Sequence, residues 1–122
     1  MIFETIKYKV SDNIATLTLN RPEVFNSLNE QMHMELKTVL NSVKKDKSIR
    51  VLVITGEGKA FCAGQDLKEV TSPELNPGFK KILEEHYNPI IIRIREIKKP
   101  VIGAINGVAA GAGVGIAAIG ML

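Results

Sequence analysis

The chain has 122 residues, of which 45% are hydrophobic and 24% charged, and its formal net charge is +3. These values are typical of a globular protein and exclude a disordered or collagen-like chain, and the length fits one domain. Aromatic residues make up only 5%, Trp is absent and the basic residues are spread over several segments, so we expect no nucleic-acid partner.

Two segments with alternating hydrophobicity open the chain. Residues 2–10 alternate loosely, and the segment IATLTL, residues 14–19, alternates more cleanly. The turn-forming residues Ser11-Asp12-Asn13 lie between them, which predicts a β-hairpin over residues 2–19. Pro22 ends the second strand because proline cannot continue an inner ladder.

A helix and a buried strand are expected next. Ser27 is predicted as the helix N-cap, with Glu30 at capping-box spacing, and apolar residues recur at helical intervals to about Lys45. The run VLVIT, residues 51–55, is typical of a strand covered on both faces in a parallel sheet. The order of these elements predicts a βαβ unit with a helical crossover.

A second helix-then-strand unit repeats this arrangement. The pattern is helical over residues 77–98, with Pro89 inside it. Either the helix kinks there, or Pro89 opens a second helix after a break at Asn88. A second buried strand is expected over residues 101–105.

Two loops rich in small residues follow the two predicted buried strands. They are KAFCAGQDL, residues 59–67, and NGVAAGAG, residues 106–113. Each leads towards a predicted helix start, where unpaired backbone N–H groups attract an oxyanion or a phosphate. Taken singly, the loops fit an ordinary turn or tight helix packing. Together, at the carboxyl ends of parallel strands, they also fit an oxyanion hole for an acyl oxygen.

These two motifs, with LNRPEVFNSLN at residues 19–29, resemble the crotonase superfamily of enoyl-CoA hydratases and isomerases over nearly the whole chain. The resemblance implies an α/β fold, the crotonase-like ββα spiral, that binds acyl-CoA thioesters and stabilises an enolate. Because such chains are typically much longer, it also implies that residues 1–122 form an incomplete acyl-CoA-binding domain whose C-terminal half is absent. A truncated gene product, proteolysis or an expression boundary would each explain this.

The resemblance assigns roles to particular residues. The backbone N–H groups of Gln65 and Ala112 would form the oxyanion hole. Contacts with the substrate and its coenzyme A moiety would come from Phe25, Ala63, Gly64, Gln65, Asp66, Leu67, Ala109, Gly111 and Ala112. Coenzyme A is part of the substrate, so no separate cofactor is expected.

By the resemblance, Gly115 stands where the hydratases have their first catalytic glutamate. The resemblance therefore favours isomerase chemistry, a shift of a double bond, over hydration, and it is greatest to isomerases such as those of phenylacetate breakdown. No general acid or base is identifiable, so whether the chain is an active enzyme stays open. The alternative is a truncated or catalytically inactive acyl-CoA-binding fragment.

The other titratable residues are expected outside the chemistry. Asp66 is expected to cap a following helix, and Cys62 to be packed. Solvated or surface positions are expected for His33, His86, Glu69, Glu84 and Glu85, without metal-ligand spacing.

Location and assembly follow from weaker signals. The single cysteine excludes an internal disulfide and no signal peptide is recognisable, which favours the cytoplasm. The last 22 residues carry no charge, but six glycines and the Asn106-Gly107 turn divide them, so we expect no membrane span. The resemblance implies a homo-oligomer, a trimer or a hexamer.

Overall fold

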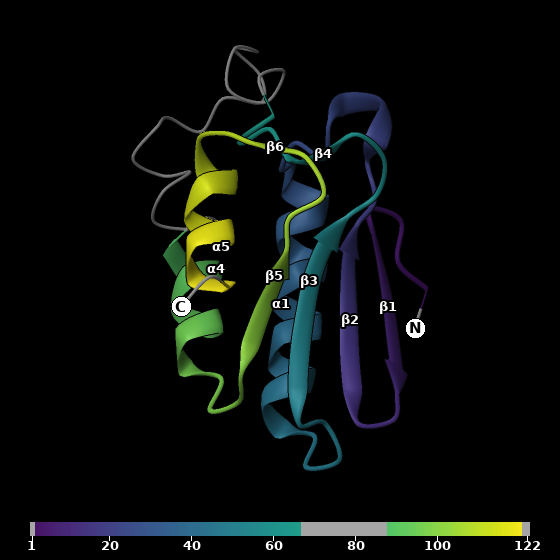
Figure 1. Cartoon of the computed structure of the whole chain (residues 1–122), viewed down its shortest axis with the longest axis vertical. Helices are drawn as coiled ribbons and strands as arrows, with labels where there is room; N and C mark the ends of the chain where they lie inside the picture. Colours follow the sequence, from purple (N-terminus) through teal and green to yellow (C-terminus); the bar gives the residue numbers. More distant parts are fainter. Residues whose placement is uncertain (1, 67–87, 121–122) are drawn as a thin grey trace.

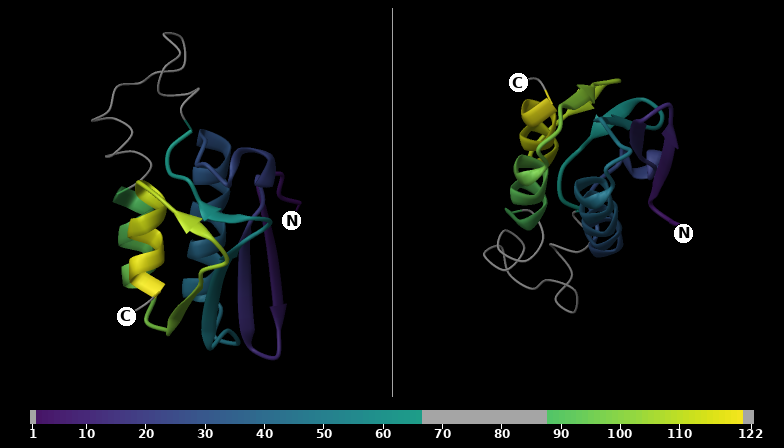
Figure 2. Two further views of the ribbon diagram at one scale, coloured as in Figure 1. Left: turned by 45° about the horizontal axis from the view of Figure 1, so that its top comes forward. Right: turned by 90° about the horizontal axis from the view of Figure 1, so that it is seen from below.

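The structure is a computed structural model that describes residues 2–66 and 88–120. A four-stranded sheet has the order β1-β2-β3-β5, and three helices lie on one side of it (Figures 1 and 2). The strands are β1 (Ile6–Ser11), β2 (Ile14–Leu19), β3 (Val51–Gly56) and β5 (Val101–Ala104). The helices are α1 (Glu30–Lys45), α4 (Asn88–Glu96) and α5 (Ala112–Gly120). This arrangement confirms the predicted α/β class.

Two smaller elements complete the described part of the chain. A short second sheet pairs β4 (Ala60–Cys62) with β6 (Val108–Ala109). A 3-10 helix, η1 (Pro22–Val24), follows the hairpin. The sequence patterns predicted neither element, because a strand of two or three residues is too short to show periodicity.

The hairpin and the first crossover are confirmed. Strands β1 and β2 are antiparallel, and the turn residues Asp12 and Asn13 have φ values of 53° and 68°, which Asp and Asn tolerate well. Strand β1 begins at Ile6 rather than at residue 2. Helix α1 then connects β2 to β3, which pair in parallel, as the predicted βαβ unit requires.

The predicted N-cap of α1 is wrong. Asn29, not Ser27, caps the helix, and its Oδ1 accepts a hydrogen bond from Met32 N–H at 2.9 Å. The physical reason lies in Leu28, which forms an isolated parallel bridge with Gln65. Extended backbone at Leu28 delays the start of the helix by two residues.

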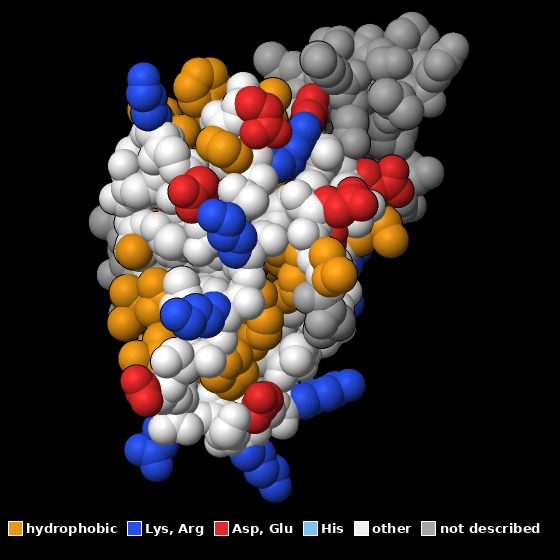
Figure 3. Space-filling model, turned by 90° about the vertical axis from the view of Figure 1, so that its right-hand side faces the viewer, with side chains coloured by type: hydrophobic (Ala, Val, Ile, Leu, Met, Phe, Trp, Pro, Cys, Tyr) orange, Lys and Arg blue, Asp and Glu red, His pale blue; other side chains and the backbone are white. Residues whose placement is uncertain are grey.

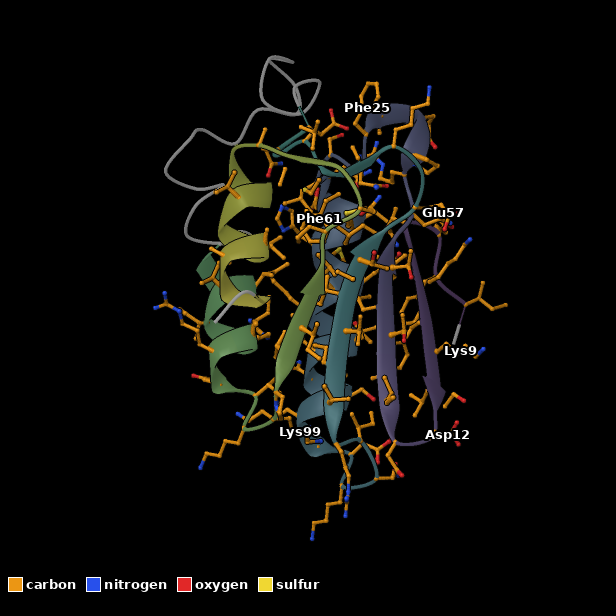
Figure 4. All side chains as sticks on the ribbon, viewed as in Figure 1. Lys9, Asp12, Phe25, Glu57, Phe61 and Lys99 are labelled. Atoms are coloured by element: carbon orange, nitrogen blue, oxygen red, sulfur yellow. The ribbon has the colours of Figure 1, made fainter. Side chains whose placement is uncertain are left out.

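The core lies between the sheet and α1. One face of α1 is buried, through Met32, Leu36, Val39, Leu40 and Val43. It packs in one cluster with the inward side chains of β2 and β3, which are Ala15, Leu17, Leu19, Leu52 and Ile54. Phe61 lies buried beyond the end of β3 (Figure 4). Each fully buried large side chain contributes about 1.5–3 kcal/mol, so this cluster supplies the main stabilising term.

Strand β5 corrects another expectation. The sequence predicts a buried strand over residues 101–105, but β5 ends at Ala104, pairs only with β3 among the described residues and has alternating burial. Ile102 is 49% exposed. Among the described residues no element covers the face of β5 that carries Ile102. The continuous apolar run in the sequence therefore overestimated the burial of this strand.

The structure bears on some expectations for the C-terminal part and not on others. Helix α4 is described from Asn88, so the choice between a kink and a new helix start at Pro89 depends on residues outside those that the structure describes. No helix in the described residues is long and apolar enough to span a membrane. The expectations for Leu67, Glu69, Glu84, Glu85, His86 and the helical stretch before Asn88 lie outside those residues.

Charges of both signs are distributed over the β1 side of the molecule. Lys and Arg side chains alternate there with Asp and Glu (Figure 3). One ion pair on the surface joins Lys7 Nζ to Glu57 Oε2 at 3.3 Å. Pairs this exposed contribute about 0–1 kcal/mol, so they add little to stability.

A buried carboxylate fastens the start of β1 to α1. Glu35 Oε1 accepts hydrogen bonds from Thr5 N–H at 2.8 Å and Thr5 Oγ1–H at 2.5 Å, and Oε2 accepts from Glu4 N–H at 3.0 Å and Gln31 Nε2 at 2.9 Å. Burial raises the pKa of Glu35, but these hydrogen bonds favour the charged form more strongly, and the net pKa is lowered.

We expect Glu35 to make stability depend on pH. A carboxyl group with a lowered folded-state pKa stabilises the fold above its unfolded pKa, near 4.5, and this contribution is lost as the pH falls through the folded value. Glu35→Gln should lower the free energy of unfolding at pH 7 by about 2 kcal/mol and remove this part of the pH dependence. Urea unfolding between neutral and acidic pH measures both effects. Glu23→Gln, at an exposed position, is the control, and parallel pH curves for the parent and Glu35→Gln would contradict the expectation.

Candidate functional site

The pairing of β4 with β6 brings the two small-residue loops together. Ala60 lies opposite Val108 and Cys62 opposite Ala109, in parallel. Ala110 N–H then donates to Cys62 O at 3.0 Å. The carboxyl ends of β4 and β6 therefore lie side by side. The two small-residue loops meet there, as the sequence predicted.

Direct backbone contact joins the loops at two glycines. Gly64 has φ of +106° and Gly111 of +53°, both in the region that favours glycine. A methyl group on Gly64 would lie 3.1 Å from Ala110 O and 3.6 Å from Ala112 N, and one on Gly111 would lie 3.7 Å from Gly64 Cα. Small residues in both motifs thus allow two stretches of main chain to touch.

Gln65 is held in an extended conformation beside the start of α1. Leu28 N–H donates to Gly64 O at 2.7 Å, and Asp66 N–H donates to Leu28 O at 2.9 Å. Successive N–H groups of an extended chain point to opposite sides, so this bridge directs the N–H of Gln65 away from Leu28.

Ala112 is the first residue of α5. Its N–H belongs to the first turn, whose amides have no acceptor within the helix. The next two amides have local acceptors: Gly113 N–H donates to Ala110 O at 2.9 Å and Val114 N–H to Gly111 O at 3.1 Å. The helix geometry therefore leaves Ala112 N–H as the amide of this turn best suited to a ligand.

Two asparagines hold the loop that leads into β4. Asn26 Nδ2 donates to Ala60 O at 2.9 Å and to Glu57 O at 3.0 Å. Asn106 Nδ2 donates to the same Ala60 O at 3.0 Å and to Gly58 O at 3.0 Å. Asn26 lies in the motif of residues 19–29 and Asn106 in the motif of residues 106–113, so both of these motifs support the one at residues 59–67. Sequence reasoning missed this role, although both asparagines stand in the motifs.

A cavity of about 390 Å³ opens beside the first loop. Its lining includes four predicted contact residues, which are Phe25, Ala63, Gln65 and Asp66, together with the unpredicted Arg21, Glu23, Val24 and Ser27. Phe25 is 57% exposed and projects at the end of the molecule where the loops meet (Figure 4). Gly64, Ala109, Gly111 and Ala112 are not part of this lining.

Asp66 has a partner that the sequence did not predict. Arg21 Nη2 lies 3.0 Å from Asp66 Oδ2, and both side chains are largely buried. Arg21 Nη1 also donates to Ser27 O at 2.6 Å. The helix that Asp66 was expected to cap lies outside the described residues. The ion pair fixes the guanidinium at the wall of the cavity.

His33 contradicts the expectation of a solvated histidine. Its side chain is fully buried on α1, and Nε2 lies 3.1 Å from Gln65 Oε1. Charged neighbours in the sequence suggested an exposed position, but His33 falls on the face of the helix that meets the site. Cys62 is packed as expected, and burial raises the pKa of its thiol. Residues 2–66 and 88–120 contain no cluster of metal-ligating side chains.

Comparison with known proteins relates this arrangement to one family. The sequence model of the enoyl-CoA hydratase/isomerase family matches residues 9–120. The 1,2-epoxyphenylacetyl-CoA isomerase of Escherichia coli K12 is 46% identical over 120 residues, which cover 95% of this chain and 45% of that protein. The trans-2-decenoyl-[acyl-carrier-protein] isomerase of Streptococcus mutans is 35% identical over 119 residues, covering 96% and 45%.

Solved structures agree with the sequence comparison. The crystal structure of an enoyl-CoA hydratase from Bacillus anthracis superposes with a TM-score of 0.80 at 30% identity. The match covers 95% of this chain and 45% of the hydratase chain. The chain therefore has the same fold as these relatives but spans less than half of their length.

Proposed function

Because the chain belongs to the enoyl-CoA hydratase/isomerase family, we propose that it binds an acyl-CoA thioester and polarises the thioester carbonyl between two backbone amides. These amides are the N–H groups of Gln65 and Ala112. The observation that carries the proposal is the contact of the two loops, where Gly64 and Gly111 bring the main chain before Gln65 against the start of α5. Two amides from separate loops suit one oxygen with two lone pairs.

The proposed chemistry is a shift of a carbon–carbon double bond. Removal of a proton α or γ to the thioester forms an enolate, whose oxygen gains negative charge as the proton leaves. Both amides hydrogen-bond this oxygen more strongly than they bond the neutral carbonyl, so they lower the barrier. Loss of one such donor costs about 3–4 kcal/mol in other enzymes. Return of the proton at a different carbon completes the isomerisation.

Gly115 supports isomerisation over hydration. Gly115 lies one turn after Ala112 in α5 and has no side chain to activate water. Among the relatives, some are named isomerases and others hydratases, so Gly115 alone carries this preference. We assign no general base among the residues of this chain. A truncated or catalytically inactive acyl-CoA-binding fragment stays the alternative.

The cavity beside the first loop is proposed to receive the coenzyme A moiety. Phe25 offers an exposed ring on which an adenine can stack. Ala63 and Asp66 line the same wall. We further propose a cytoplasmic homo-oligomer, a trimer or a hexamer, which gel filtration with mass measurement tests.

The oxyanion hole can be tested without turnover. With 2-enoyl-CoA carrying a ¹³C label in the thioester carbonyl, we expect the carbonyl resonance to move downfield on binding, because hydrogen bonds withdraw electron density from the carbonyl carbon. Conversion of 3-enoyl-CoA to 2-enoyl-CoA, followed by absorbance and NMR, tests the isomerase activity. A bound ligand whose carbonyl resonance stays at its solution value would refute the oxyanion hole. Binding with a downfield shift but no conversion would favour the fragment.

A further inference from the structure

The contact between His33 and Gln65 has no part in the chemistry described so far. His33 is completely buried, and imidazoles are seldom buried without a defined hydrogen bond. Its Nε2 lies 3.1 Å from Gln65 Oε1. An amide oxygen can only accept, so in this contact the ring carries its hydrogen on Nε2 and donates it to Gln65.

We propose that His33 is a positioning residue that sets the direction of the Gln65 backbone N–H through the Gln65 side chain. This inference rests on the proposed oxyanion hole and deepens it. His33 touches no reacting atom, and its effect on the substrate passes through Gln65.

Two contacts, one of the main chain around Gln65 and one of its side chain, support the proposal. The bridge to Leu28 holds the main chain on both sides of Gln65, at Gly64 O and Asp66 N–H. The first of these hydrogen bonds holds the C=O of the peptide unit that also carries Gln65 N–H, so the bridge restrains this unit from the main-chain side. The hydrogen bond from His33 holds the side chain of Gln65 against α1.

Both contacts come from the start of α1, one from His33 in the helix and one from Leu28 just before it. His33 N–H donates to Asn29 O at 3.1 Å within the capped first turn of the helix. Leu28 and His33 are only five residues apart, so the Leu28 bridge and the His33 hydrogen bond hold Gln65 from one short segment of the chain. A displacement of about 1 Å in a catalytic group can cost about a hundredfold in rate, so such a support matters to an oxyanion hole.

Variants of His33 and Gln65 test the proposal in the purified protein, with ¹³C-carbonyl 2-enoyl-CoA as the probe. His33→Leu keeps the apolar volume but lacks the donor, and we expect it to lose about half or more of the downfield carbonyl shift. His33→Gln, which keeps an N–H at similar reach, should recover most of the shift. Gln65→Leu retains the backbone N–H and should behave like His33→Leu.

The double variant and a control separate positioning from stability. If His33 acts only through the Gln65 side chain, His33→Leu adds no further loss in a Gln65→Leu background. Val39→Ala removes buried volume elsewhere on α1, so it should lower the unfolding temperature but keep the full shift. If His33→Leu does not fold, the half-buried Gln65→Leu still tests the contact.

The failures are distinguishable. Absence of a carbonyl shift in the parent protein would refute the proposed oxyanion hole itself. A parent shift that persists in full in His33→Leu or Gln65→Leu would overturn the role of His33 alone. Equal losses in His33→Leu and His33→Gln would also overturn it, because the donor would then be irrelevant.

Discussion

Replacing Asn26 by Ala is expected to destabilise the protein by about 3 kcal/mol, one of the largest effects available to a single polar side chain here. Asn26 is completely buried, and its side chain makes three hydrogen bonds to the main chain, at Arg21 N–H, Glu57 O and Ala60 O. Truncation removes all three hydrogen bonds, of which the one to Ala60 O is buried and those to Arg21 N–H and Glu57 O are partly buried. Its φ of 57° adds a cost for Ala, because Asn tolerates this region better.

Asn106→Ala provides a matched control. Asn106 also makes three side-chain hydrogen bonds, at Gly56 N–H, Gly58 O and Ala60 O, but it is exposed, so water can replace the lost partner. We expect a loss of about 1 kcal/mol. Urea unfolding of both variants measures the difference. Equal losses would show that burial does not determine the cost of these contacts.

Replacing Gly113 by Ala is expected to abolish the downfield shift of a bound thioester carbonyl. In an ordinary helix interior this change is stabilising, by about 1 kcal/mol. Here the new methyl group would overlap Cys62 O and lie 2.8 Å from Cys62 Cβ. Since Cys62 O is a backbone atom in β4, the start of α5 must move instead, and Ala112 N–H moves with it.

The neighbouring exposed position gives the comparison for this variant. Val114 is 51% exposed on the same turn of α5, so Val114→Ala should leave both the carbonyl shift and stability almost unchanged. Carbonyl NMR on the bound ligand and thermal unfolding measure the two properties. A Gly113→Ala protein with a full carbonyl shift would mean that α5 can withdraw from β4 without moving the amide.

Local patterns predicted the larger elements well. The alternation of residues 14–19 and the helical spacing up to Lys45 placed β2 and α1 within a few residues, because each pattern reflects one buried face. The N-cap was misplaced, since Ser27 and Asn29 are both good caps and only the bridge from Leu28 to Gln65 decides between them. A partner 37 residues away in sequence leaves no trace in a local motif.

The candidate site was predictable only in part. The motifs located the loops of Gln65 and Ala112, and the fold places these loops in contact. The side chains that support them were not predicted. His33 was expected in solvent because periodicity gives the angle of a residue around its helix but not which neighbouring loop covers it. Asn26 and Asn106 share one acceptor, Ala60 O, a fact that only three-dimensional structure reveals.

The parallel register of β4 and β6 has a consequence for how such a protein can vary. The separation of the two amides is fixed by which residue of one strand stands opposite which residue of the other, not by the amount of chain that connects them. Insertions or deletions between the strands can therefore alter what surrounds a ligand of the proposed oxyanion hole while the placement of the two amides stays the same. Under the proposed function, the substrate can change in evolution while the two amides that would bind its carbonyl oxygen are kept.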